Sequence, residues 1–307
     1  MGRPPNRTSS RSSASTQPRS ATASQAVTRG SEAGEKGALY IVSTPIGNMG
    51  DMSFRAVEVL SSAALVVAED TRHSRRLLDH YQITTRCSAY HEHNEARETP
   101  RLVKRLLDGE TIALITDAGT PLLSDPGARL VAAAIDAGVS VIPIPGASAL
   151  LAALVGSGLA GEKFTFFGFL PRKGKERLHA LTDIMRMRHT AILYEAPPRV
   201  GATLTEIAEA GAGARTAVVA RELTKKFEEY ARGTVAELAQ RFVETAPRGE
   251  VVILIGGAAA EVLSEDMLAG EARRLRSVGA APRDIVERLI SEHGAPRNLA
   301  YKLAHES

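Results

Sequence analysis

The stretch TIALITDAGTPLLSDPG, residues 111–127, joins a short apolar run to a loop rich in Gly, Asp, Pro and Thr. The run 112–115 predicts a strand that is buried on both faces. In open α/β sheets, ligand clefts lie at the carboxyl ends of such strands, where Asp117 stands. The glycines and prolines of the loop allow its backbone to approach a small molecule closely. The alternative is a tight strand-to-helix turn in which Asp125 caps the helix.

Two further strands end in turns of the same kind. TPIGNMGD (44–51) follows the first apolar strand, and VIPIPGASAL (141–150) places Ser148 at a helix start, where free backbone amides can meet a polar ligand. The carboxyl ends of parallel strands meet at one sheet edge, so the three turns together favour a small-molecule cleft there. The chain contains neither a GxGxxG fingerprint after its first strand nor a Walker-type phosphate loop.

Apolar strands alternate with amphipathic helices from Leu39 onward, which predicts βαβ units and a parallel sheet. In the second half, a strand near 228–232 is expected to form a hairpin with its predecessor, giving mixed strand order. After Gly257 only helices are readable, with breaks at 279–282 and 294–296. We therefore predict a disordered basic tail (1–37), an N-terminal α/β domain (38–158), a C-terminal α/β domain (159–258) and a helical appendix (259–307).

Composition indicates a globular protein with an unusual N-terminus. The 307 residues are 44% hydrophobic and include one cysteine, so no internal disulfide can form and a reducing cytoplasmic setting is expected. No apolar run is long enough to predict a membrane span. The first 37 residues carry six Lys and Arg against two acidic residues, whereas residues 38–307 carry 32 against 33. The basic net charge therefore belongs to the Ser- and Arg-rich tail, which is expected to be disordered.

Three polar segments could carry chemistry. AEDTRHSRR (68–76) follows a buried strand and suggests a second-substrate surface, or else an ion-paired helix start. HEHNE (91–95) offers imidazoles and carboxylates, but its histidine spacing matches no familiar zinc site, so contact with a substrate is favoured over a metal. Segment 171–188 holds six basic and two acidic residues, which fits either a solvated helix face or contact with phosphate.

Several motifs then occur together in a characteristic order: STPIGN, AEDTR, HEHNE, ITDAGTPLLSDPG, PIPGASA, GFLPRK, YEAPPR, ARELTKKFEE and the Gly-Glu before the last strand. In order and spacing they resemble the ribosomal small-subunit RNA methyltransferase I family, within the tetrapyrrole-methylase class of S-adenosylmethionine enzymes. The resemblance covers residues 39 to about 305. One departure is Pro198, where a histidine is expected, so a direct role for that side chain is unsupported.

The resemblance implies two α/β domains with the methyl donor in a cleft between them, and transfer of a methyl group to the ribose 2′ oxygen of a cytidine in the decoding region of 16S ribosomal RNA. It also implies a homodimer. Because the sulfonium of the donor carries its own leaving-group activation, no metal is expected. Carried onto this chain, the donor contacts are Ile46, Asp117, Thr120, Ser148, Ala149, Tyr194, Ala220 and Gly249.

A ribose hydroxyl is a weak nucleophile, so a base or a polarising cation should assist removal of its proton. The candidates from the sequence, left unresolved, are Glu69, Asp70, Arg72, His91 and Glu92. The residues expected to contact RNA are Arg172, Lys173, Lys175, Arg177, Arg221 and Lys225. The mildly basic helical appendix is also expected to dock RNA, with dimer packing as its alternative role.

Two rival functions remain open on the sequence. One is a corrin or porphyrin precursor methyltransferase on the same fold, which would need neither the basic 171–188 segment nor the helical appendix. The other is a catalytically silent RNA-binding factor for ribosome assembly. Donor binding distinguishes the silent factor from both enzymes.

Overall fold

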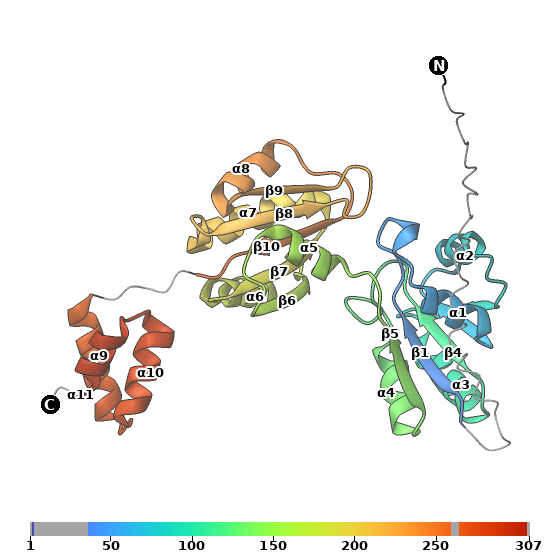
Figure 1. The fold of residues 1–307 in the computed structure, drawn as a ribbon, viewed down its shortest axis with the longest axis horizontal. Helices are drawn as coiled ribbons and strands as arrows, with labels where there is room; N and C mark the ends of the chain where they lie inside the picture. Colours follow the sequence, from blue (N-terminus) through green and yellow to red (C-terminus); the bar gives the residue numbers. More distant parts are fainter. Residues whose placement is uncertain (1, 3–35, 259–263, 306–307) are drawn as a thin grey trace. The chain divides into compact units, whose positions relative to one another are not determined.

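The computed structural model describes residues 2, 36–258 and 264–305. Almost all of the predicted basic tail therefore lies outside the described residues. The described part contains two five-stranded sheets with flanking helices, followed by three C-terminal helices (Figure 1). This confirms the α/β fold class that the sequence predicts, and the domain bounds remain a prediction.

The first sheet is entirely parallel, as the βαβ pattern predicts, and has the order β3-β2-β4-β1-β5. Its strands are β1 (Ala38–Val42), β2 (Leu65–Ala68), β3 (Cys87–Ala89), β4 (Ile112–Ile115) and β5 (Ser140–Ile144). All four residues of β4 are buried, which confirms the strand buried on both faces. The three-residue edge strand β3 was not predicted from the sequence.

Helices cover both faces of this sheet. They are α1 (Phe54–Ser62), α2 (Thr71–His80), α3 (Glu95–Leu107) and α4 (Ala128–Asp136), with a short 3₁₀ turn η1 (Met49–Asp51) after β1. One core packs α1 and α2 against one face of the sheet, and a second packs α3 and α4 against the other. The helices that follow β1 and β4 thus lie on opposite faces. Neighbouring strands with this property define the switch point where such sheets bind ligands.

The second sheet has the order β6-β7-β10-β8-β9 and mixed direction. Its strands are β6 (Phe164–Phe169), β7 (Thr190–Glu195), β8 (Thr216–Arg221), β9 (Glu229–Thr234) and β10 (Val251–Ile255). β6 and β7 are parallel, and the other pairs are antiparallel. Strand β9 pairs with its predecessor β8, so the predicted hairpin and the predicted mixed order are both confirmed.

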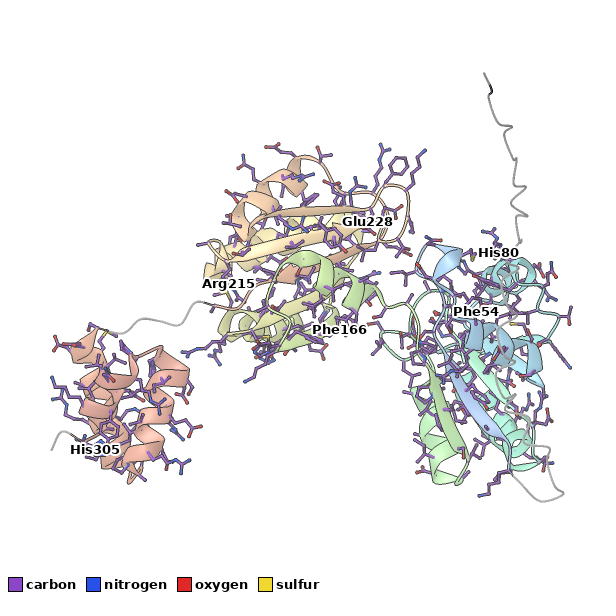
Figure 2. All side chains as sticks on the ribbon, viewed as in Figure 1. Phe54, His80, Phe166, Arg215, Glu228 and His305 are labelled. Atoms are coloured by element: carbon purple, nitrogen blue, oxygen red, sulfur yellow. The ribbon has the colours of Figure 1, made fainter. Side chains whose placement is uncertain are left out.

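Helices α6 (Lys175–Arg186), α7 (Val200–Ile207) and α8 (Val235–Glu244) share one core with this sheet, and the helical turn η3 (Ala208–Ala212) after α7 contributes to it. A short 3₁₀ turn, η2 (Pro197–Arg199), precedes α7. Helix α8 is absent from the sequence prediction although a capping box, Thr234 with Glu237, marks its start. Arg215 anchors this half through its guanidinium, which donates to the carbonyls of Gly256 and Ile184, each at 2.7 Å (Figure 2).

Helix α5 (Ala149–Ser157) packs on the other face of the second sheet. Its Leu150, Ala153 and Leu154 form a core with residues of β8 and β10. Ile46, from the loop after β1, joins the same core. The loops of the first sheet are therefore tied to the second sheet through apolar contacts.

The C-terminal helices are α9 (Glu265–Ser277), α10 (Pro282–His293) and α11 (Arg297–His305). They are separated by left-handed glycines, Gly279 and Gly294, at the predicted breaks. Their buried residues form a core of their own. No helix in the described part of the chain is both long and apolar enough to cross a membrane.

Candidate active site

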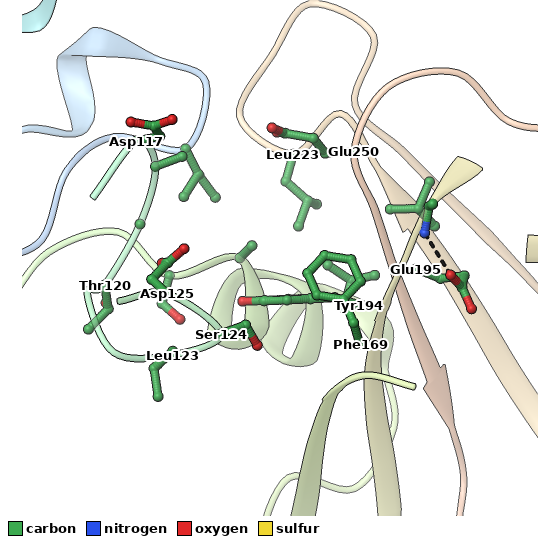
Figure 3. Close-up of a pocket in the computed structure, with 18 of the residues that line it drawn as sticks. Asp117, Thr120, Leu123, Ser124, Asp125, Phe169, Tyr194, Glu195, Leu223 and Glu250 are labelled. Atoms are coloured by element: carbon green, nitrogen blue, oxygen red, sulfur yellow. Dashed lines mark hydrogen bonds between the residues drawn. The ribbon is translucent and has the colours of Figure 1, made fainter. Parts of the chain in front are cut away.

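A cavity of about 510 Å³ lies at the carboxyl ends of β1 and β4, the switch point of the first sheet (Figure 3). The start of α5, the end of β7 and the start of β10 complete its wall. Seven of the eight residues that the resemblance implies as donor contacts line it: Ile46, Asp117, Thr120, Ser148, Ala149, Tyr194 and Gly249. The eighth, Ala220, is fully buried in β8, where it pairs with Val252 of β10.

The loop after β4 is held in an irregular shape by backbone contacts. Gly119 exchanges two backbone hydrogen bonds with Thr44 of the first loop, at 2.8 and 3.0 Å, and its φ of +83° requires a glycine-like conformation. Leu122 and Ser124 also have positive φ, 73° and 72°. Non-glycine residues with such φ store strain, which often marks functional loops. The loop is therefore more than a simple turn into α4.

Asp125 does not cap helix α4. The sequence leaves open a tight strand-to-helix turn in which it would do so. The N-cap is Gly127, with a φ of 131° and no side-chain capping bond among the described residues. The Asp125 side chain lines the cavity instead. The sequence signal was ambiguous, because Asp before Pro fits both a helix cap and a bend that precedes the helix.

Two hydroxyl residues shape the floor between the loops. The Thr120 hydroxyl donates to the carbonyl of Ala147 at 3.2 Å and lies 3.1 Å from the hydroxyl of Ser43. This contact ties the loop after β4 to the start of α5. Ser148 occupies the N-cap of α5, but its side chain caps none of the described first-turn amides. Those amides and the hydroxyl can therefore serve a polar ligand, as the sequence predicts.

The second sheet contributes an aromatic and apolar wall. The ring of Tyr194 packs against Phe166 and Phe169 with centroids 4.8 and 5.6 Å apart. These contacts direct Tyr194 across the cavity toward Ser124 and Asp125 (Figure 3). Burial raises the pKa of Tyr194, and the charge of Asp125 raises it further, so its phenol stays neutral at physiological pH.

Charged residues from the second half close the wall near Gly249, whose φ is +83°. Lys225 forms ion pairs with Glu222 at 2.9 Å and with Glu250 at 3.1 Å, and Glu250 lines the cavity. The Lys225 stem packs over Gly47, where a Cβ would come within 2.5 Å of its Cγ. Lys225 therefore bridges loops of both sheets. Arg221 is likewise ion-paired, with Glu229 at 2.7 Å.

Three carboxyl groups gather on the wall from the first sheet: Glu69, Asp117 and Asp125. Burial raises the pKa of Glu69, and the charge of Asp117 raises it further. Burial also raises the pKa of Asp125 to about 6, and its two acidic neighbours add to the effect although the Thr116 hydroxyl lowers it. The cavity therefore holds acidic side chains that titrate closer to neutrality than ordinary carboxyls.

Among the described residues, Glu69 is the one catalytic candidate from the sequence that reaches the cavity lining. Asp70 caps α2, accepting the backbone N–H of Arg72 at 2.8 Å, and these hydrogen bonds lower the pKa of its carboxyl. Arg72 is 92% exposed and pairs with Asp70. His91 is half-buried near Glu69, whereas Glu92 is exposed in the turn before α3. Pro198, the departure from the motif, is exposed.

The basic residues around the start of α6 divide into two kinds. Arg172, Lys173 and Lys175 are exposed, as a phosphate-binding role requires. Arg177 is not: it is 7% exposed, and its guanidinium contacts Glu206 at 2.7 Å, the Thr203 hydroxyl and the Pro171 carbonyl. The expectation that Arg177 contacts RNA therefore fails on its burial, because helix periodicity turns this position toward α7.

Replacing Arg177 by alanine should lower the free energy of unfolding by about 2 kcal/mol, because buried acceptors then lose a charged donor. Urea titration followed by circular dichroism measures the change. Arg172→Ala provides the exposed control and should change stability by less than about 0.5 kcal/mol. Equal effects of the two substitutions would contradict the structural role of Arg177.

Several lining residues were not among the residues predicted for the site. They include Ser124, Asp125, Phe169, Leu223 and Glu250. Ser124 and Asp125 belong to the loop that the sequence analysis singled out, so proximity to Asp117 could have suggested them. The described residues contain no group of three His, Cys, Asp or Glu arranged to hold a metal ion.

Residues 38–239 match the model of the tetrapyrrole (corrin/porphyrin) methylases. The chain belongs to this family. It is 46% identical over 273 residues to the ribosomal RNA small subunit methyltransferase I of Synechocystis, covering 88% of this chain and 98% of the relative. It is 50% identical over 225 residues to the protein of the same name from Mesorhizobium japonicum, covering 73% and 76%.

Two solved structures share the fold. A uroporphyrin-III C-methyltransferase from Thermus thermophilus, in complex with S-adenosyl homocysteine, matches with a TM-score of 0.54 at 18% identity, covering 72% of this chain and 97% of that one. The cobalamin biosynthetic enzyme cobalt precorrin-4 methyltransferase matches with a TM-score of 0.55 at 19% identity, covering 71% and 94%. These matches support the arrangement of the two sheets.

Proposed function

We propose that this methylase transfers a methyl group from S-adenosylmethionine to the ribose 2′ oxygen of a cytidine in the decoding region of 16S ribosomal RNA. The observation that carries the proposal is the cavity at the switch point, lined by loops from both sheets. The names of the relatives at 46% and 50% identity support an RNA substrate from the small ribosomal subunit.

The cavity fits the methyl donor in size and chemistry. Its volume lies within the range of about 300–1,000 Å³ that is usual for small-molecule sites. The apolar side chains of Ile46 and Leu223 would accept the adenine ring. The free amides at the start of α5 would hold the carboxylate of the donor, and the acidic wall suits its positive sulfonium.

The donor, when bound, supplies a methyl group that is already activated for transfer. The residues of this chain then have three tasks: to align the acceptor oxygen with that methyl group, to exclude water, and to receive the hydroxyl proton. The loops after β1 and β4 and the Tyr194 wall perform the first two tasks. The carboxyl groups of the cavity are available for the third.

RNA recognition is assigned to exposed basic surfaces outside the cavity. Arg172, Lys173 and Lys175 are exposed beside the start of α6 and can neutralise phosphates. Arg221 and Lys225 can do so only by exchanging their present carboxylate partners for RNA. The helical appendix offers further exposed arginines, and the enzyme is proposed to act as a cytoplasmic homodimer.

Calorimetry with the donor and transfer of its labelled methyl group test this function. The acceptors are small-subunit particles, naked 16S RNA and a reduced tetrapyrrole. Donor binding and label in ribosomal RNA are the expected results. Donor binding with label in the tetrapyrrole alone would support the corrin or porphyrin alternative. Absence of donor binding would support the silent assembly factor.

A further inference from the structure

The five carboxyl groups that line the cavity differ in how fully other residues of the protein already bind them. Asp117 accepts the backbone N–H of Asp70 at 3.2 Å, which fixes its orientation. Glu195, although it lines the cavity, is held by Arg199, the Thr203 hydroxyl and the amide of Ala196. Glu250 is ion-paired with Lys225. The hydrogen bonds and ion pairs of these three carboxyl groups would have to break or weaken before the groups could accept a proton.

Asp125 is in a different situation. Its side chain is half-buried on the cavity wall, and the groups that face it are Glu69 after β2, Asp117 after β4, Thr116 at the end of β4 and Tyr194 of β7. Glu69 and Asp117 are acidic, and Thr116 and Tyr194 are neutral hydroxyl groups. Within the described residues, no Lys, Arg or His forms an ion pair with it. A carboxyl group in this setting loses its proton less readily than an ordinary one, and a cation from outside the chain would stabilise its charged form.

The hydroxyl beneath the two carboxyls supports this interpretation. Thr116 is 2% exposed, and its Oγ1 is buried with no hydrogen-bond partner among the residues that the structure describes. It lies near both Glu69 and Asp125 and lowers the pKa of each. Burying a hydroxyl without a partner is costly, so the geometry is one that a bound ligand or a shift of a carboxyl group would complete.

We propose that Asp125 accepts the proton of the ribose hydroxyl during methyl transfer, beside the positively charged sulfur of the donor. This inference rests on the proposed function. It assigns the catalytic base to a residue outside the group predicted from the sequence. Of that group, Glu69 alone lines the cavity, with its carboxyl near His91 as well as Asp117, whereas Asp125 lies next to the positive-φ residue Ser124 and opposite Tyr194.

The chemistry balances within the site. As the hydroxyl oxygen bonds to the methyl carbon, the carbon–sulfur bond breaks and its electron pair stays on sulfur. The hydroxyl proton passes to a carboxylate oxygen of Asp125. One positive and one negative charge therefore become a neutral thioether and a neutral carboxylic acid. Because burial disfavours separated charges, a half-buried site favours this neutralisation. The proton leaves to solvent once the products depart.

Binding provides a test that does not depend on turnover. Burial and the acidic neighbours raise the pKa of Asp125 to about 6, so near pH 6 the free protein carries a proton there about half of the time. A sulfonium placed beside it would lower that pKa and release the proton. S-adenosylhomocysteine lacks the positive sulfur, so its binding should release fewer protons at the same pH. Calorimetry in buffers of different ionisation enthalpy measures this difference.

Asp125→Asn, which keeps the shape of the side chain, should lower kcat by about 10²- to 10⁴-fold. It should leave the affinity for S-adenosylhomocysteine within about threefold, which also reports that the variant is folded. The wild-type kcat/KM for the donor, which reports the groups of the free enzyme, should fall with slope one below about pH 6, and that limb should vanish in Asp125→Asn. The difference in proton release between the two ligands should vanish as well. Glu69→Gln is the matched control: it should keep an acidic limb, which moves to lower pH because the charge of Glu69 no longer raises the pKa of Asp125.

Three outcomes would overturn the inference. The first is a rate for Asp125→Asn within threefold of the wild-type rate. The second is that Glu69→Gln, and not Asp125→Asn, loses the rate and the acidic limb. The third is equal proton release by the wild-type protein on binding of either ligand. Failure of the proposed function is distinguishable. In that case no ribosomal RNA is labelled, while the comparison of the two ligands still reports whether Asp125 faces the sulfonium.

Discussion

Asp117→Ala is expected to raise the dissociation constant of the methyl donor by about 10- to 100-fold. Hydrogen bonds to a charged group contribute about 1.5–3 kcal/mol, which corresponds to this range. Asp117 lines the cavity and accepts the Asp70 amide, so its removal loosens the loop after β4 and removes an anionic contact. The affected quantity should be affinity, measured by calorimetry, with kcat at saturating donor reduced much less.

Asp117→Ala should also shift the pH dependence. The charge of Asp117 raises the pKa of Glu69 and of Asp125, so its removal lets both values fall. The acidic limb of the rate should then move to lower pH. Asp136→Ala, an exposed position at the end of α4, is the control and should change neither property. Loss of turnover with unchanged donor affinity would show that Asp117 acts in the chemistry instead of in binding.

Removing the helical appendix, residues 262–307, is expected to weaken binding to ribosomal RNA by about 10- to 100-fold while donor affinity stays unchanged. The described appendix residues form a core separate from the cores of both sheets, so the cavity does not depend on them. Arg273, Arg283 and Arg297 are exposed there, whereas Arg274 pairs with Glu271 and Arg276 donates to the Leu303 carbonyl. Filter binding across a salt series measures the loss.

A full-length double variant, Arg283→Glu with Arg297→Glu, controls for the truncation. If these side chains neutralise phosphates, the affinity falls and the slope of log affinity against log salt becomes smaller by about one per lost contact. A change in the oligomeric state with unaltered RNA affinity would assign the appendix to dimer packing instead.

The sequence predicts the architecture well where apolar patterning is continuous. The buried run 112–115 and the alternation of strands with helices determine the parallel first sheet, and the glycines near 279 and 294 mark the helix ends. Strand β3 escapes because three residues at a sheet edge, Cys87–Ala89, leave no periodic signal. Helix α8 is marked in the sequence by the capping box at Thr234, but a prediction from helix propensity alone does not use this motif.

The candidate site is predictable as a set of loops but not as a set of side-chain roles. Loop positions follow from topology, since parallel strands deliver their carboxyl ends to one edge. Whether a charged residue in a helix faces solvent or a neighbour depends on tertiary packing, which is why Arg177 and Asp70 turned out to be structural. Asp125 shows the reverse case: a residue that reads as a helix cap lies on the cavity wall.

The proposed activity is methylation of a ribose in small-subunit RNA. The most direct test is to incubate unmethylated small-subunit particles with this protein and S-adenosylmethionine, digest the RNA to nucleosides and identify the modified nucleoside by mass spectrometry. The expected product is 2′-O-methylcytidine, with the added mass on the sugar fragment and its position in the decoding region. A methyl group on the base fragment would contradict the account.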